Sequence, residues 1–193
     1  MNGLALSLAC EFLARAAVER PAYFRRLALV SPTGFRGSRA WRAAPGSARG
    51  LPWLQPLLRG LGDAWGGALF RGRTRPGVVR YFLQRTWGGQ AIDEDLWAYD
   101  LLTTRQRGAE FAPLQFLSAG LFSADIHTVY DQLAQPVWMS HGVRGNFTDD
   151  RGCRFVTAKP NWQLTVYPTD ALPHFEVPIA FFADFDAFLA GAG

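Results

Sequence analysis

Four short apolar runs, each about the length of a β-strand, constrain the fold of this chain more than any other feature. The clearest is Leu27–Val30, in RRLALVSPTGF, which ends at the turn residues Ser31 and Pro32. Its apolar residues are consecutive rather than alternating, which is typical of a strand buried in a parallel sheet. The other runs are NGLALSL, Val137–Met139 and WQLTVYP. Because parallel strands are usually joined by helices, we predict an α/β fold with a mostly parallel sheet.

Helices are expected after the first run and at the end of the chain. LACEFLARAAVER repeats its apolar residues at helical spacing. In the tail EVPIAFFADFDAFLAG, Pro178 takes a first-turn position, and Asp184 and Asp186 lie off the apolar face. That face consists of Val177, Phe181, Phe185 and Phe188. We therefore predict that the tail is a helix packed on the sheet.

The amino-acid composition changes between Arg36 and Tyr130. Gly, Pro, Arg and Trp become frequent there, and the helical segments VVRYFLQRTW and EDLWAYDLLTTRQ alternate with glycine breaks. This pattern predicts a helical insertion within the sheet domain. We accordingly divide the chain into a core segment 1–35, an insertion 36–130 and a second core segment 131–193.

Composition excludes several classes of partner. The 193 residues are 49% hydrophobic, and twenty basic against sixteen acidic residues give a net charge of +4. Lys159 is the one lysine, and the other basic residues are arginines. The arginines are scattered among carboxylates, so no nucleic-acid partner is expected. The apolar runs are far shorter than the roughly 20 residues that a membrane span needs. No His, Cys, Asp or Glu spacing indicates a metal, and no glycine loop indicates a nucleotide cofactor; the oligomeric state is left open.

The two cysteines and the N-terminus bear on location. Cys10 and Cys153 form neither a disulfide framework nor a metal motif, so we expect reduced thiols and a cytoplasmic protein. A secretory or lipoprotein leader over Met1–Cys10 is the alternative. It is disfavoured because the segment has no positive n-region, its apolar run is short, and the charged Glu11 comes directly after it.

The stretch ALSLA, Ala5–Ala9, places Ser7 where the first strand meets the first helix. A tight turn at such a corner lifts the serine above the sheet edge, and small neighbours two residues away let strand and helix approach. The segment resembles the G-x-S-x-G nucleophile elbow of the α/β-hydrolase family, with alanines in place of the glycines. The resemblance implies that Ser7 is the nucleophile and that the backbone N–H of Leu8 belongs to the oxyanion hole.

Two later segments resemble the same family. PVWMSHGVRGNFTDD is similar to the strand and loop that carry the catalytic acid, and ALPHFEVPIAFFADFDAFL is similar to the histidine loop and final helix. The resemblance implies His174 as general base. Gly145 and Asn146 occupy the usual acid position, so we predict Asp149 as the acid, with Asp150 and Asn146 as alternatives.

The resemblance covers about Met1–Phe35 and Ala134–Gly193, and likens the middle to a helical cap. It implies a partial α/β-hydrolase fold, the C-terminal half of the sheet, because the family has further strands before the nucleophile. The second oxyanion donor would come from that half. We therefore expect an N-terminally truncated chain, either a fragment or a start assigned too late.

The implied function is hydrolysis of a carboxylic ester or a related small acyl substrate by a serine nucleophile, without a cofactor. Serine at the elbow favours acyl chemistry over the dehalogenation and epoxide opening that an aspartate nucleophile performs. The alternative is a catalytically inactive remnant of this fold, or a non-enzymatic binding protein, because the acid position is altered and the first half is absent.

Overall fold

The computed structural model describes residues 1–35, 39–50, 70, 72, 74–87, 89–109, 111, 115–116, 118–144, 153, 155–156 and 158–191. The chain forms two compact units. The sheet unit comprises Met1–Gly46 and Ala124–Gly193, and the insertion unit comprises Ser47–Ser123. No described helix has the length and apolar character required to cross a membrane. The predicted boundaries at residues 35 and 130 stay a prediction.

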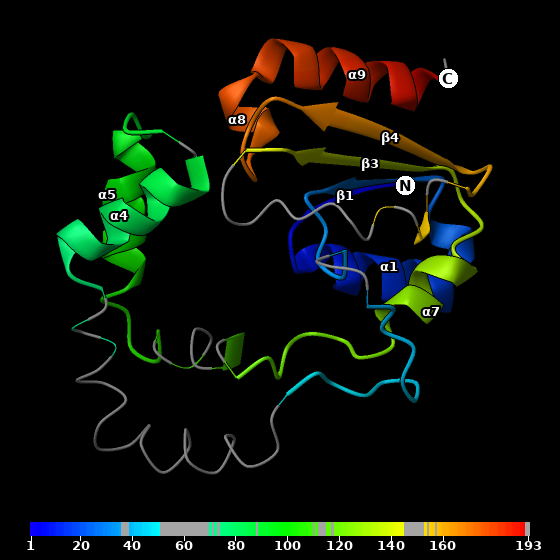
Figure 1. Ribbon diagram of the computed structural model, residues 1–193, viewed down its shortest axis with the longest axis horizontal. Helices are drawn as coiled ribbons and strands as arrows, with labels where there is room; N and C mark the ends of the chain where they lie inside the picture. The colour runs from blue at the N-terminus through cyan, green and yellow to red at the C-terminus, as the bar shows by residue number, and fades with distance from the viewer. Residues whose placement is uncertain are drawn as a thin grey trace. The chain divides into compact units, whose positions relative to one another are not determined.

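A parallel sheet of four strands forms the centre of the sheet unit. The strands are β1 (Asn2–Leu6), β2 (Arg26–Val30), β3 (Val137–Gly142) and β4 (Trp162–Tyr167), and they lie in that order across the sheet. Every neighbouring pair is parallel, which confirms the predicted α/β class. All four strands therefore end at the same edge of the sheet (Figure 1).

The third strand is longer than predicted. The apolar run that predicted it ends at Met139, but pairing with β4 continues to Gly142 opposite Tyr167. Ser140 and His141 are buried and belong to the strand. The prediction was too short because it relied on apolar residues alone, whereas the hydrogen-bond ladder tolerates polar residues at the buried end of a strand.

Helices cover both faces of the sheet (Figure 1). The helix α1 (Ala9–Glu19) and the helix α7 (Ile126–Gln132) pack on one face, where Cys10, Ala14 and Tyr130 meet the strand side chains. The helix α9 (Pro178–Ala190) packs on the other face. A sheet covered on both faces explains the consecutive apolar residues Leu27–Val30 of β2, all of which are buried.

Aromatic rings fill the space between α9 and the sheet. The Trp138 ring of β3 lies 5.2 Å from the Phe181 ring, and Phe185 and Phe188 complete the cluster. The Tyr167 hydroxyl of β4 donates a 2.6 Å hydrogen bond to Asp184 on the helix. The predicted C-terminal helix and its apolar face are thus confirmed.

Short segments complete the sheet unit. The 3₁₀ helix η1 (Pro21–Tyr23) precedes β2. The loop after β4 leads into the one-turn helix α8 (Pro173–Glu176), which lies against β3. The loop contacts the ends of two strands, because Ser31 Oγ donates to the Ala171 carbonyl over 2.7 Å and Arg144 N–H donates to the Thr169 carbonyl over 2.8 Å.

The insertion unit contains the helices α4 (Pro76–Trp87) and α5 (Glu94–Thr103), which pack together. Arg80 forms an ion pair with Glu94 and stacks 4.7 Å from the Trp97 ring centroid. Within these two described helices, no residue is buried. The two ends of the unit run side by side, since Ala48 forms an antiparallel bridge with Ser123.

Candidate active site

Ser7 lies at the corner between β1 and α1. Its φ of +55° is left-handed, a conformation that costs an L-residue roughly 1–2 kcal/mol. The sheet ladder reaches this residue, because Ser7 N–H donates to the Val30 carbonyl over 2.9 Å, and α1 begins two residues later at Ala9. The Ser7 side chain is exposed, and its hydroxyl has no hydrogen-bond partner among the described residues. The corner therefore presents a free hydroxyl at the sheet edge.

Ser31 lies at the same point of the neighbouring strand and provides a comparison. Its φ is +46°, and its N–H donates to the Ser140 carbonyl over 2.6 Å. Unlike the hydroxyl of Ser7, the hydroxyl of Ser31 forms a hydrogen bond, which it donates to the Ala171 carbonyl. Two adjacent strands thus end in a left-handed serine, and of these two described serines only Ser7 has a hydroxyl available for chemistry.

Leu8 lies between Ser7 and the first residue of α1, Ala9. It is the N-cap residue of α1, and its N–H has no acceptor among the described residues. Free N–H groups and the positive end of the helix dipole favour a negative charge at this position. The assignment of the Leu8 N–H to the oxyanion hole stays a prediction.

His174 lies in α8, on the face of the sheet covered by α9. Its ring is half-buried and packs against the rings of Phe175 at 4.7 Å and Phe181 at 5.6 Å. Burial lowers the pKa of the imidazole, which favours the neutral form that a general base requires. Within the described residues, no hydrogen bond joins His174 to Ser7, and His174 Nδ1 is buried without a partner.

The predicted acids lie outside the described residues. Asp149, Asp150 and Asn146 all belong to the segment 145–152, as does Gly145. The assignment of the acid to Asp149 therefore stays a prediction.

Sequence reasoning missed Asp170, which is fully buried in the loop after β4. Neither carboxyl oxygen has a well-aligned hydrogen-bond partner among the described side chains and backbone groups, although the adjacent Ala171 N–H lies close enough to act on its charge. Burial raises the pKa of this carboxyl, and the charge of Glu176 raises it further, whereas Ala171 N–H and Arg144 oppose the shift. A local signal was hard to find, because Asp170 stands in the turn sequence YPTDALP, where aspartate is common.

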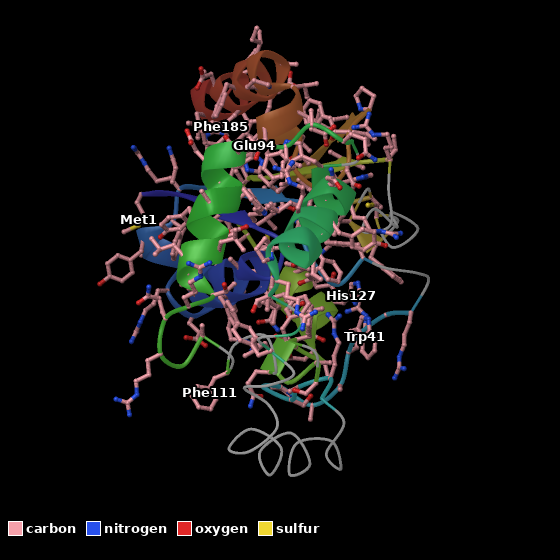
Figure 2. The ribbon with its side chains drawn as sticks, turned by 90° about the vertical axis from the view of Figure 1, so that its left-hand side faces the viewer. Met1, Trp41, Glu94, Phe111, His127 and Phe185 are labelled. Atoms are coloured by element: carbon pink, nitrogen blue, oxygen red, sulfur yellow. The ribbon has the colours of Figure 1, made fainter. Side chains whose placement is uncertain are left out.

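Two other histidines have structural roles. His141 is 6% exposed, and its Nδ1–H donates to the Gly142 carbonyl over 2.8 Å. His127 is buried in α7. Figure 2 shows it beside Trp41, whose backbone N–H donates to His127 Nδ1 over 2.6 Å.

No protein-family model matches the sequence, and no curated protein is similar enough in sequence to count as a relative. Solved structures match it in fold. A serine hydrolase from Cycloclasticus zankles has a TM-score of 0.65 at 15% identity, covering 100% of this chain and 64% of its own. A meta-cleavage product hydrolase from Pseudomonas fluorescens has a TM-score of 0.67 at 14% identity, covering 100% of this chain and 65% of its own.

A third match is the 2-hydroxy-6-oxo-6-phenylhexa-2,4-dienoate hydrolase from Rhodococcus sp., with a TM-score of 0.65 at 14% identity. It covers 94% of this chain and 61% of its own. The chain therefore spans less than two thirds of the length of each of these structures. Low identities of this kind show the fold alone, and together with the parallel sheet and its helices they show that this chain has the α/β-hydrolase fold.

Proposed function

We propose that this chain is a serine hydrolase that cleaves a carboxylic ester or a related small acyl substrate in the cytoplasm. The observation that carries the proposal is the strained, exposed corner at Ser7, whose φ is +55° and whose hydroxyl is free among the described residues. Backbone strain of this kind persists where the surrounding structure enforces it, and it concentrates at functional sites. The similarity in fold to hydrolases supports the same reading.

The proposed reaction uses three groups of the sheet unit. Ser7 Oγ attacks the substrate carbonyl while His174 accepts the hydroxyl proton, and the Leu8 N–H stabilises the oxyanion that forms. His174 then returns the proton to the leaving alcohol, and water releases the acyl group by the same steps in reverse roles. The lowered pKa of His174 keeps the imidazole neutral at pH 7, as the first step requires. Asp149 stays the sequence-predicted acid, and the insertion unit is proposed as the cap.

Labelling with a serine-directed fluorophosphonate tests the nucleophile. We expect the purified chain to be labelled, and Ser7→Ala to abolish both labelling and hydrolysis of a short activated ester. Ser31→Ala is the matched control, because Ser31 shares the left-handed backbone but its hydroxyl is already bonded to Ala171 O. Labelling that persists in Ser7→Ala would show that the nucleophile is elsewhere.

A second candidate function is an inactive hydrolase remnant that binds a partner. It is favoured by one observation, the lack of any hydrogen bond between Ser7 and His174 in the described structure. Catalytic hydrogen bonds are often poorly aligned without substrate, so the observation does not remove the first candidate. Absence of labelling in a folded wild-type chain, checked by circular dichroism, would select this second function.

A further inference from the structure

Asp170 is held at the sheet edge by contacts of its own loop with two strand ends. A Cβ at Gly142 would lie 2.0 Å from the Asp170 carbonyl oxygen, so the loop backbone rests directly on the end of β3. On the side of β2, Ser31 Oγ bonds the carbonyl of Ala171, the next residue. Asp170 N–H donates to Glu176 Oε1 over 2.8 Å. These contacts hold the loop of Asp170, whose carboxyl is fully buried, against the ends of β2 and β3, and β2 pairs with β1, the strand that leads to Ser7.

Unpartnered polar atoms gather around this loop. Asp170 Oδ1 and Oδ2, His174 Nδ1 and His141 Nε2 are all buried without a hydrogen-bond partner among the described residues. Buried polar groups are nearly always hydrogen-bonded, and exceptions call for a functional explanation. Here the exceptions are complementary, since a carboxylate accepts hydrogen bonds and an imidazole N–H donates one.

The two imidazoles differ in which nitrogen is buried. In His141 the Nδ1–H is used by the Gly142 carbonyl and Nε2 is enclosed, so this ring has no nitrogen left for a substrate. In His174 the buried, unpartnered atom is Nδ1, and Nε2 is not among the enclosed atoms of the described residues. A general base that works through Nε2 needs an acceptor for its Nδ1–H, and that acceptor must lie on the buried side.

We propose that Asp170 is the positioning carboxylate of His174, accepting its Nδ1–H in place of a residue of the segment 145–150. This inference rests on the proposed function for its catalytic meaning, but the contact itself can be measured without it. Asp170 and His174 lie four residues apart in the loop after β4 and the turn of α8, and each has a buried polar atom without a partner among the described residues. Such bonds tighten when substrate binds.

Three charged or titratable groups of the described residues face the pair. Glu176 from α8 forms an ion pair with Arg144, which follows β3, and His141 faces the loop from the end of β3. Arg144 therefore offsets the charge of Glu176 near the loop. The raised pKa of the unpaired Asp170 agrees with a carboxyl that lacks its donor, and a bond from His174 would lower it.

The proton balance of the proposed step is simple. The proton of Ser7 Oγ moves to His174 Nε2 as the oxygen bonds the substrate carbon. The Nδ1 proton stays on the ring and is shared in a hydrogen bond with Asp170, which stabilises the imidazolium without taking the proton. The Nε2 proton then passes to the leaving oxygen, and the acyl group stays on Ser7 Oγ. Water then gives a proton to Nε2 as it attacks the acyl carbon, and that proton passes to Ser7 Oγ as the acid is released, so Asp170 ends each cycle unchanged.

Nuclear magnetic resonance of the histidine ring nitrogens in the full chain tests the proposal. In the wild type we expect neutral His174 to carry its proton on Nδ1. In Asp170→Asn we expect the imidazole pKa of His174 to fall by about one unit or more, because an opposing charge has been removed. The matched control is Asp184→Asn, which removes a carboxylate bonded to Tyr167 and should leave the His174 signals unchanged. Asp149→Asn tests the rival acid predicted from the sequence. A second measurement is kcat for a short activated ester, which should fall by about 10⁴-fold in Asp170→Asn.

The outcomes separate this proposal from the proposed function. A fall in the His174 pKa in Asp149→Asn but not in Asp170→Asn would overturn it, as would a change at His141 instead of His174. If Asp170→Asn does not fold, the position of the proton on neutral His174 in the wild type is the test. A proton on Nδ1 supports the assignment of Asp170, and a proton on Nε2 contradicts it. If fluorophosphonate does not label the chain but the His174 pKa still falls in Asp170→Asn, the contact between Asp170 and His174 is supported and the proposed hydrolase function is rejected.

Discussion

Replacing Ser7 by glycine should make the protein more stable and inactive at once. The substitution removes the hydroxyl and also the Cβ that makes the left-handed φ of +55° unfavourable. Ser7→Ala removes only the hydroxyl and keeps the Cβ. Comparing the two variants therefore isolates the backbone strain at the corner from the loss of the nucleophile.

The size of the effect follows from two opposing contributions. Relief of the left-handed conformation is worth roughly 1–2 kcal/mol, whereas the greater freedom of glycine in the unfolded chain costs about 0.5–1 kcal/mol. The net gain for Ser7→Gly is therefore between about 0 and 1.5 kcal/mol, a Tm increase of up to about 6 °C for a chain of this size. Ser7→Ala should change stability little, because the exposed hydroxyl has no partner in the described structure.

Urea denaturation followed by circular dichroism, with fluorophosphonate labelling of the same samples, is the assay. Ala183→Gly on the exposed side of α9 is the control of opposite sign, since glycine in a regular helix costs about 1 kcal/mol relative to alanine. Ser31→Gly should change the free energy of unfolding by close to zero, because the relief of backbone strain is offset by loss of the hydrogen bond from Ser31 Oγ to Ala171 O. If Ser7→Gly destabilises the chain as much as Ala183→Gly does, the corner is not strained and the reasoning fails.

Three further outcomes are expected. Gly142→Ala should cost about 1–3 kcal/mol or more in urea denaturation, because its Cβ would lie 2.0 Å from a carbonyl oxygen; Gly77→Ala in α4, with open space around it, should not destabilise. His174→Gln should gain stability relative to wild type as pH falls below about 6.5, since the folded pKa of His174 is lowered and its protonation favours unfolding; equal pH curves would contradict this. Tyr167→Phe should cost about 1 kcal/mol through the lost bond to Asp184, measured by thermal unfolding with and without Asp184→Asn as a double-mutant cycle.

Much of the fold could be predicted because its signals are local. The consecutive apolar residues of Leu27–Val30 indicated a strand buried on both faces, and the phenylalanine spacing after Pro178 indicated the face of α9. Where the prediction fell short, at the end of β3, polar residues are buried by contacts with other parts of the chain. Ser140 and His141 have no local feature that distinguishes a strand end from a loop.

One part of the candidate site could likewise be predicted from local sequence, and another part could not. The corner at Ser7 was predictable, because a short strand passes directly into a helix and the turn between them must be tight. Asp170 was not, because its burial depends on Gly142, a residue of a different strand, which leaves room for the loop backbone. A glycine shortly after a buried apolar run is a signal that could have marked the end of β3 as a place of close backbone approach.

The paired ends of the insertion unit also affect how the chain folds. The strands β2 and β3 are neighbours in the sheet, yet the whole insertion separates them in sequence. The bridge between Ala48 and Ser123, continued by the bond from Ala43 N–H to the Ala124 carbonyl, closes this long loop at its base. Closing the base has its own entropy cost, but it leaves a loop of about a quarter of the length, and each halving lowers the entropy cost of the later pairing of β3 with β2 by roughly 0.6 kcal/mol. Once the base has formed, β3 reaches β2 as if the two were close in sequence, so the insertion can vary in length or composition with little effect on assembly of the sheet.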